Sequence, residues 1–458
     1  MSLKLAPIAR RYVLGHLVRE RANHMSDSIV VEGGQPLHGT VRVSGAKNAA
    51  LPLIAATLLS SGRCTIKNVP DLTDIHGLLD ILREVGLEAN WKGPGTLATQ
   101  VKSETNCVAR YELVSKMRAS IYLLGPLLAK RGFARVSLPG GCVIGLRPVD
   151  LHLKGLRALG AEITLDHGYI VAKAPPGGRL RGAHMFLGGA MGSSVGATAN
   201  VLMAASLADG KTVIEGAACE PEIDDLAYFL NRMGATIEGI GTPRLVITGV
   251  PELGSATTSV MPDRIEAATY LMAAGMTGGE VRVEDIRLNH MAAVIDRLEA
   301  AGLEIVEEEE NVARVRRVRP LEAVQMTTLP YPAYPTDCQA QLVSMLSLAK
   351  GISVVTEKIY PDRFHHLAEL NRMGADIHKE GSSAIIRSVD RLSGCDVEAS
   401  DLRAAAALIC AGLVAEGETR VHKIFHLDRG YERMELKLQS LGAKIKRDVA
   451  AKPAAKAA

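Results

Sequence analysis

The chain has 458 residues, which is too long for one hydrophobic core and predicts two domains. Its 53 lysines and arginines against 50 aspartates and glutamates leave a net charge of +3, and only 3% of its residues are aromatic. This balance argues against the basic or aromatic-rich surfaces on which nucleic-acid binding depends. Seven cysteines without a CxxC pair argue against a disulfide framework or a cysteine-based zinc site and favour a reducing cytoplasm.

The first 24 residues are basic and nearly free of acids. Such a segment is either a targeting peptide, a membrane-surface helix or a dispensable extension. No small-residue cleavage pattern follows an apolar stretch, and Met25 begins "MSDSIVVEGG" in the manner of a start. We therefore expect residues 1–25 to be a basic, disordered extension, and residues 449–458 to be a disordered tail.

One phrase recurs six times along the chain, as in "LRALGAEI" and "LNRMGATI". Its glycines lie 68 to 74 residues apart and are Gly86, Gly160, Gly234, Gly302, Gly374 and Gly442. A near-constant period of this kind indicates a fold built from six copies of one unit. With two domains, the pattern predicts three units per domain.

Each unit contains a glycine that opens an alternating strand, followed by an amphipathic helix that ends at the repeated glycine. A more apolar helix precedes that strand, at residues 49–61, 119–131, 195–209, 265–277, 339–350 and 404–416. The alternation predicts an α/β protein with the apolar helices inside and the amphipathic helices and sheets outside. The longest apolar run, residues 404–415, is shorter than the ~20 residues of a membrane span, so we expect no membrane partner.

Polar residues stand at the start of each apolar helix. They are Lys47, Asn48, Arg118, Ser194, Asp263, Arg264, Asp337, Asp401 and Arg403. Because the units are equivalent, these side chains are expected to share one face of each domain, where helix N-termini favour anions. Aspartate and serine can simply cap such helices, but lysine and arginine are not capping residues, so their recurrence predicts an anionic ligand.

A further polar set follows the glycine-led strands. It is expected to border a cleft at the same anion-binding face. It consists of Cys142, Arg147, Glu220, Asp362, Arg363, Asp428 and Arg429. Cys142 lies within "PGGCVIGLRPVD" (139–150), for which the residues alone leave two interpretations open. The thiol is either buried and inert beside a turn, or reactive on a glycine-rich loop that carries it to an anionic ligand.

Seven segments, in order, resemble the UDP-N-acetylglucosamine 1-carboxyvinyltransferases of the enolpyruvyl transferase family. They are "SGAKNAALP" (44–52), "MRASIYLLGPLLA" (117–129), "LPGGCVIGLRPVDLH" (138–152), "EPEI" (220–223), "PTDCQAQ" (335–341), "DLRAAAAL" (401–408) and "HLDRGYER" (426–433). The resemblance runs from near residue 28 to near residue 446. It covers nearly all of the repeated part of the chain.

The resemblance implies a two-domain inside-out α/β barrel of six βαβαββ units, three per domain, with the active site in the interdomain cleft. It also implies that the N-terminal strand returns to the second domain. Residues 47–261 would then form the domain that carries the cysteine loop, and residues 26–46 with 262–448 would form the other.

The implied reaction transfers enolpyruvate from phosphoenolpyruvate to the 3′-hydroxyl of UDP-N-acetylglucosamine and releases phosphate, as the first committed step of peptidoglycan synthesis. Addition gives a tetrahedral ketal, and elimination restores the enol ether. The expected partners are these two small molecules, with no nucleic acid, no metal and no organic cofactor. We expect a cytoplasmic protein, and the sequence does not determine its oligomeric state.

The resemblance also implies roles for single residues. Those expected to act in catalysis are Cys142, Asp337, Lys47, Arg429 and Asp401. Those expected to hold phosphate and carboxylate are Lys47, Arg118, Arg147, Arg403 and Arg429. Asn48 matches a contact to phosphoenolpyruvate or the sugar, Asp337 a general base at the 3′-hydroxyl, and Asp401 a second acid beside the reacting carbons. Contacts to the nucleotide sugar are expected from Arg147, Pro148, Val149, Asp150, Leu151, Ser194, Val195, Glu220 and Ile359.

Cys142 matches the family's loop cysteine, which is regarded as a proton donor to the enolpyruvate methylene and as a participant in product release. Gly140, Gly141 and Gly145 would let the loop fold over a ligand, and nearby arginines favour the thiolate. An epoxide phosphonate such as fosfomycin is therefore expected to alkylate this thiol.

One segment departs from the family pattern. Family members often carry a lysine shortly before the serine of "SVGAT", whereas this chain reads "GGAMGSSVGAT" (188–198), which is longer and has no lysine. A contact to the sugar diphosphate is expected to be lost or supplied from elsewhere.

Two rival functions have to be weighed. An enolpyruvyl transferase on the same fold acts on shikimate 3-phosphate, but "SGAKNAALP" and the cysteine loop argue against it. A catalytically silent paralogue that binds UDP-N-acetylglucosamine would lack one of the reactive residues. Lys47, Cys142, Asp337 and Arg429 are all present.

Two other patterns are expected to be structural. The run "EEEE" (307–310) before "RVRRVR" (314–319) predicts a solvated hairpin with opposed charges. His365 and His366 have no third ligand at a useful spacing, so no metal site is expected there.

Overall fold

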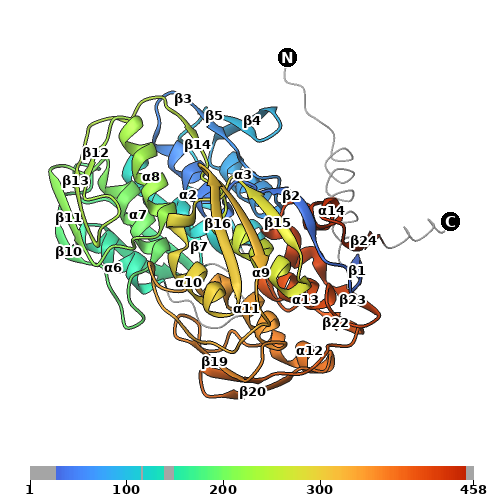
Figure 1. Ribbon diagram of the computed structural model, residues 1–458. Coiled ribbons are helices and arrows are strands. Elements are labelled where there is room, and N and C mark those ends of the chain that lie inside the picture. Colours follow the sequence, from blue (N-terminus) through green and yellow to red (C-terminus); the bar gives the residue numbers. More distant parts are fainter. Residues whose placement is uncertain (1–26, 115–116, 139–148, 450–458) are drawn as a thin grey trace, which may run out of the picture.

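The computed structural model describes residues 27–114, 117–138 and 149–449 of the chain (Figure 1). Strands within these ranges form six four-stranded sheets. In each sheet one outer strand runs parallel to its neighbour, and the other neighbouring strands are antiparallel. The six sheets therefore share one arrangement.

Three of the sheets contribute to a first hydrophobic core. They are β14 (Thr257–Ser259), β3 (Arg63–Lys67), β5 (Thr96–Val101) and β4 (Leu87–Gly93); β6 (Val108–Ala109), β7 (Phe133–Ser137), β9 (Tyr169–Lys173) and β8 (Glu162–Asp166); and β10 (His184–Phe186), β11 (Lys211–Glu215), β13 (Arg244–Thr248) and β12 (Thr236–Glu238).

The other three sheets contribute to a second hydrophobic core. They are β2 (His38–Arg42), β15 (Glu280–Glu284), β17 (Val312–Arg317) and β16 (Leu303–Glu309); β18 (Gln325–Thr328), β19 (Ile352–Glu357), β21 (Ser383–Arg387) and β20 (Asp376–Glu380); and β22 (Asp396–Glu398), β23 (Glu418–His422), β1 (Ser28–Glu32) and β24 (Lys444–Asp448).

Six apolar helices lie in the interior of these cores. They are α2 (Lys47–Ala56), α5 (Leu124–Arg131), α7 (Val195–Ala205), α9 (Arg264–Thr277), α11 (Gln339–Leu346) and α13 (Leu402–Gly412). Every residue of α11 is buried, as is all of α13 from Arg403 onward. A helix that is apolar on all sides requires packing on all sides, which explains its central place.

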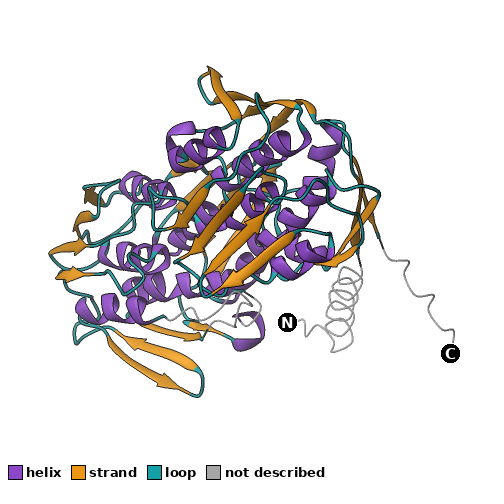
Figure 2. Ribbon diagram, turned by 60° about the horizontal axis from the view of Figure 1, so that its bottom comes forward, coloured by secondary structure: helices purple, strands orange, loops and turns teal. Residues whose placement is uncertain are grey.

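Six further helices bury only one face. They are α3 (Thr73–Glu84), α6 (Asp150–Ala158), α8 (Pro221–Arg232), α10 (Ala292–Ala300), α12 (His366–Arg372) and α14 (Met434–Ser440). In α3, for example, the buried residues Ile75, Leu78 and Leu82 recur at the helical spacing. In Figure 2 the strands at the centre of the view lie in front of helices, and other strands lie at the edge of the molecule.

Shorter helical segments complete the described fold. They are α4 (Tyr111–Val114) and the 3₁₀ helices η1 (Thr57–Leu59), η2 (Arg118–Leu123), η3 (Leu288–His290), η4 (Thr336–Cys338) and η5 (Ile424–Arg429). The single helix expected at 119–131 is divided into η2 and α5. Pro126 cannot donate the backbone hydrogen bond that would continue an α-helix through this region.

The first two strands belong to the second core. β1 lies between β23 and β24 and is antiparallel to both, and β2 is parallel to β15. In Figure 1 these blue strands lie beside yellow and red elements from the second half of the chain. Conversely, β14 from the middle of the chain completes the sheet of β3 in the first core.

The chain therefore passes between the two cores twice, near residue 45 and near residue 262. The two passages lie side by side. The amide of Ala46 donates to the carbonyl of Met261 at 2.7 Å, and the amide of Asp263 donates to the carbonyl of Ser44 at 2.9 Å. Gly45 fits here because an added Cβ would lie 1.9 Å from the carbonyl oxygen of Asn68.

The charged hairpin was correctly predicted. β16 and β17 pair antiparallel, with Arg316 bound to Glu304 at 2.6 Å and Arg314 to Glu308 at 2.7 Å.

Among the described residues no helix is both long enough and apolar enough to cross a membrane.

The passage between the cores gives a first testable prediction. Gly45→Ala is expected to lower the free energy of unfolding by about 3 kcal/mol, because the clash is with backbone that cannot easily move. Chemical denaturation measures this change. The control is Gly77→Ala in α3, where the nearest neighbouring atom would be 3.8 Å away and alanine is expected to add up to about 1 kcal/mol. Equal stability of Gly45→Ala and wild type would contradict the tight packing.

Candidate functional site

The N-termini of the apolar helices carry two kinds of polar side chain. Asp263 and Asp401 are true caps, since each accepts backbone hydrogen bonds from the first turn of its helix, α9 and α13 respectively. Ser194 caps α7 in the same way, with its Oγ accepting from the amide of Ala197 at 3.3 Å. Lys47 and Arg403 cap nothing and extend to other charges.

Asp337 is the centre of one charged cluster. Its two carboxylate oxygens accept hydrogen bonds from Arg363 at 2.7 Å and from Arg403 at 2.8 Å. Asn48, from the first core, donates to the same carboxylate at 3.4 Å. Burial alone would raise the pKa of Asp337, but Arg403 and Arg363 outweigh it and hold the pKa well below its ordinary value. Asp337 is therefore ionised at neutral pH.

Arg403 lies at the inner side of this cluster. Its side chain is 2% exposed and its guanidinium lies 5.4 Å from the centre of the Tyr431 ring. Burial opposes its charge, yet Asp337 is the main group that raises its pKa well above the ordinary value. Within the described residues its Nε and Nη1 atoms have no hydrogen-bond partner. Buried donors of this kind are available to an anion or to water.

Asp74 is the centre of a second charged cluster, on the second residue of α3. It accepts from Lys47 at 3.4 Å and from the Nε of Arg429, in the second core, at 2.9 Å. Burial lowers the pKa of Lys47; Asp74 counters this effect, while Arg403 and Arg429 add to it. Because Lys47 and Asn48 are consecutive, one turn of α2 touches both charged clusters.

Asp401 has a buried neighbour of a different kind. Burial lowers the pKa of His366, so its imidazole is neutral, and its Nε2 has no hydrogen-bond partner among the described residues. Burial works to raise the pKa of Asp401, but the charge of Arg363 and the backbone donors of α13 keep it lowered. The pair places an ionised carboxylate near a neutral ring.

The described residues contain no group of three or more histidine, cysteine or acidic side chains that could hold a metal.

Arg264 forms an ion pair with a carboxylate of the first core. Its guanidinium forms two hydrogen bonds with the carboxylate of Glu222, at 3.0 and 3.3 Å, and the two side chains are 9% and 5% exposed. This pair links α9 of the second core to α8 of the first. The charge of Arg264 is thus compensated by a carboxylate of the other core, and its part in binding an anion stays a prediction.

Glu220 directly precedes α8 and lies near that pair. Its Oε1 accepts from the amide of Tyr331 at 3.5 Å, and burial raises its pKa. Its Oε2 is buried without a partner in the described part of the chain. Ile359 lies elsewhere in the second core, where its amide donates to Glu357 at 2.8 Å.

Several expected site residues lie outside what the structure describes. Cys142, Arg147 and Pro148 fall in the undescribed segment 139–148, and the side chain of Arg118, at the start of η2, is not described either. Val149 precedes α6, and Asp150 and Leu151 form its first turn.

The lysine-free segment before α7 forms a tight turn. Gly189 and Gly192 exchange two backbone hydrogen bonds, at 2.9 and 3.1 Å. Gly192 has φ +90°, and an added Cβ would lie 2.8 Å from Pro330 of the second core. Gly192 thus lies against the second core, while the turn itself is exposed, with Met191 50% exposed.

Sequence reasoning missed Asp74, Glu222 and the neutral His366. A signal existed for the first two, because each stands 12 positions before a repeated glycine, Gly86 or Gly234. Their arginine partners could not be inferred, since those lie in the other core.

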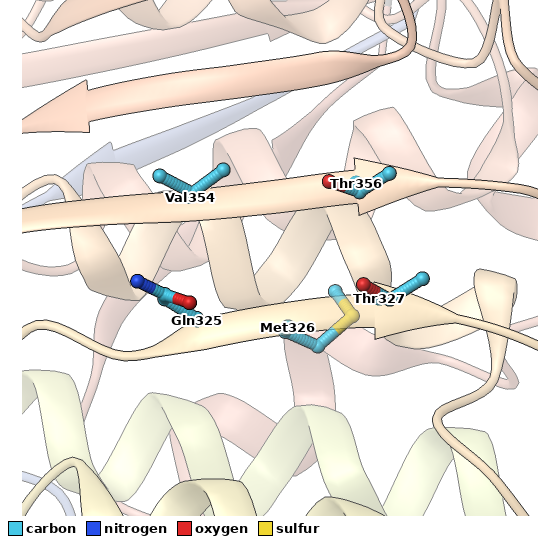
Figure 3. A pocket seen from close by; sticks show the side chains of 5 residues that line it. All are labelled: Gln325, Met326, Thr327, Val354 and Thr356. Carbon is cyan, nitrogen blue, oxygen red and sulfur yellow. The ribbon is translucent and has the colours of Figure 1, made fainter.

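A separate hollow lies on the sheet of β18 and β19 (Figure 3). It is lined by Gln325, Met326, Thr327, Val354 and Thr356. None of these side chains is charged, and none belongs to the charged clusters. The hollow therefore offers no cationic side chain to an anionic ligand.

Comparison with known proteins places these features in a context. The family model described as EPSP synthase (3-phosphoshikimate 1-carboxyvinyltransferase) matches residues 31–438. The UDP-N-acetylglucosamine 1-carboxyvinyltransferase 2 of Carboxydothermus hydrogenoformans is 52% identical over 422 residues, which cover 92% of this chain and 99% of that protein. The UDP-N-acetylglucosamine 1-carboxyvinyltransferase 1 of Caldanaerobacter subterraneus subsp. tengcongensis is 51% identical over 423 residues, covering 92% and 100%.

Two solved structures are similar at lower identity. The enolpyruvyl transferase NikO from Streptomyces tendae has a TM-score of 0.83 and 24% identity, over 93% of this chain and 100% of that chain. An EPSP synthase from Acinetobacter baumannii has a TM-score of 0.72 and 19% identity, over 92% and 100%. At these identities the likeness concerns the fold.

The Asp337 cluster gives a second prediction. Asp337→Asn leaves Arg363 and Arg403 buried without their counter-charge and is expected to lower the free energy of unfolding at pH 7 by about 3 kcal/mol. An aspartate with a lowered pKa stabilises the fold above its unfolded pKa of about 3.9, and this contribution is lost on acidification. Urea denaturation should therefore show the difference at pH 7 and a smaller one in acid. Asp362→Asn, whose side chain is 74% exposed, is the control. Identical stability of both variants at pH 7 would refute the role of the cluster.

Proposed function

We propose that this chain transfers enolpyruvate from phosphoenolpyruvate to the 3′-hydroxyl of UDP-N-acetylglucosamine. The chain belongs to the enolpyruvyl transferase family and, within it, to the UDP-N-acetylglucosamine 1-carboxyvinyltransferases. This transfer is the first committed step of peptidoglycan synthesis. The observation that carries the choice of substrate is identity of 49 to 52% with relatives of that name over 92% of this chain.

The chain has the two-domain inside-out α/β fold of the enolpyruvyl transferases. We infer that it consists of six βαβαββ units, with residues 47–261 in one domain and residues 26–46 and 262–448 in the other. The two hydrophobic cores and the return of β1 and β2 to the second core support these boundaries. The active site then lies in the cleft where the charged clusters of both cores meet.

The cations of that cleft bind the two anionic groups of phosphoenolpyruvate. Lys47, Arg403 and Arg429 are the described members of this set, and Arg118 and Arg147 complete it. The side chains of Arg403 and Lys47 are only 2% and 12% exposed, so their interaction with a bound anion is weakly screened. Guanidinium groups suit phosphate and carboxylate because they donate two parallel hydrogen bonds.

Addition forms a bond between the 3′-oxygen of the sugar and C2 of phosphoenolpyruvate, while a proton is added to C3. Asn48 and Asp337 are near enough to contact the sugar and the enolpyruvyl group together. Ionised Asp337 accepts the hydrogen bond of the 3′-hydroxyl. It becomes a stronger base when Arg403 turns to the substrate anion, because Arg403 is the main group that lowers its pKa.

Elimination removes a proton from C3 of the tetrahedral ketal and breaks the bond from C2 to the phosphate oxygen. Cys142 is the proton donor to C3 in the addition step, as the family resemblance implies. Asp401 is the second acid beside the reacting carbons. The neutral His366 near it is suited to pass on a proton. These steps need no oxidant or reductant, so we propose no cofactor.

The nucleotide sugar is held along the rim of the first domain and by one segment of the second. The residues proposed for this contact are Arg147, Pro148, Val149, Asp150, Leu151, Ser194, Val195, Glu220 and Ile359. The starts of α6 and α7 support this assignment, since backbone N–H groups there favour a diphosphate.

The reaction can be tested by phosphate release from phosphoenolpyruvate in the presence of chelator. We expect release with UDP-N-acetylglucosamine, none with shikimate 3-phosphate and none without an acceptor. Cys142→Ala should lower the rate at least ~100-fold, because it removes a general acid. Cys395→Ala, at a partly exposed cysteine that has no expected role in the reaction, is the control. Release with shikimate 3-phosphate alone would favour the activity that names the matching family model.

Alkylation by fosfomycin tests the cysteine loop separately. After incubation with the drug and UDP-N-acetylglucosamine, mass spectrometry should find the adduct on the Cys142 peptide. Cys338 and Cys410 should stay unmodified, because burial raises the pKa of each thiol to about 12. An unmodified Cys142 peptide would count against the proposed role.

A further inference from the structure

We propose that Asp74 is a positioning residue that holds Lys47 and Arg429 together across the two cores, ready for the phosphate group of phosphoenolpyruvate. The identity of that substrate rests on the proposed function above. Asp74 itself contacts the two cations and is not required to touch the substrate.

The repeat supplies a matched position for comparison. Asp74 is the second residue of α3 and Glu222 is the second residue of α8, each 12 positions before the repeated glycine of its unit. Both carboxylates are buried, with 7% and 4% of the residue exposed. Each binds an arginine of the second core, Arg429 or Arg264. Two equivalent units thus hold the second core at two points.

The two ion pairs differ in how far they are shielded from solvent. Glu222 and Arg264 share two hydrogen bonds, and the side chain of Arg264 is 9% exposed. Asp74 accepts from the Nε of Arg429, whose side chain is 29% exposed, and it also binds Lys47. The first pair is almost closed to solvent, whereas the second leaves part of its arginine exposed.

Charge explains why Asp74 is needed. Lys47 and Arg429 repel each other, since Arg429 is one of the groups that lower the pKa of Lys47. Asp74 lies between them and is the main group that opposes the effect of burial on Lys47. Without this carboxylate the substrate itself would have to draw the two cations together, and that ordering reduces affinity.

The test compares steady-state kinetics of wild type, Asp74→Asn, Asp74→Glu and Glu222→Gln. We expect Asp74→Asn to raise the KM for phosphoenolpyruvate ~10-fold or more and to leave the KM for UDP-N-acetylglucosamine within ~2-fold. Lys47 must be protonated to bind phosphate, so activity falls as pH rises through its pKa. In Asp74→Asn this fall in activity should occur at a lower pH than in wild type, and in Asp74→Glu it should return to the wild-type pH.

Controls separate positioning from general loosening. Asp80→Asn, on the same helix at a side chain that is 47% exposed, should match wild type in every measurement. Glu222→Gln should lower the melting temperature and leave the KM for phosphoenolpyruvate within ~3-fold. The inference would be overturned if Glu222→Gln raised the KM for phosphoenolpyruvate as much as Asp74→Asn does. It would also be overturned if Asp74→Asn changed neither this KM nor the pH at which activity falls on the alkaline side.

Binding of inorganic phosphate keeps this test independent of turnover. In titration calorimetry we expect Asp74→Asn to bind phosphate ~10-fold more weakly than wild type, with Asp80→Asn unchanged. If wild type releases no phosphate from phosphoenolpyruvate, the proposed function fails while the calorimetry still decides the role of Asp74. Equal or tighter phosphate binding by Asp74→Asn would refute that role, whatever the kinetics.

Discussion

The two passages of the chain between its cores are the constraint on which the site depends. Hydrogen bonds join residues 44–46 to residues 261–263, and a helix begins immediately after each passage. The first turns of α2 and α9 therefore lie at the border between the cores. From there Asn48 reaches Asp337 in the second core, and Arg264 reaches Glu222 in the first. The folding topology brings opposite halves of the chain into one charged region.

Compensation of charge governs this region. Asp337 is held by two arginines, Asp74 by a lysine and an arginine, and Glu222 by one arginine. Burying such charges is costly unless each has a partner, so the cations and carboxylates are matched before any ligand arrives. An incoming anion has to share these partners. Two of these ion pairs, Arg429 with Asp74 and Arg264 with Glu222, join opposite cores, so an anion that draws on such a pair also acts on the contact between the cores.

Repeat register located most of the described cluster residues, and it did so for a physical reason. Equivalent positions in equivalent units point the same way, so the phase of Lys47, Asp337 and Arg403 within the repeat was enough to expect them on common faces. The same logic did not predict that Arg264 pairs with Glu222 of the first core. It also overlooked Asp74. Asp263 and Asp401 do cap their helices.

The sequence by itself determined the periodic elements of this protein: the six repeated glycines, the apolar helices and the alternating strands. These depend on local spacing, which sets the face that each element must bury. Only the tertiary structure decided which charges pair, because that depends on distances between segments far apart in the chain. Arg429 and Asp74 are separated by 355 positions, and Asn48 and Asp337 by 289. No local pattern contains such contacts, since they exist only once both cores have formed and docked.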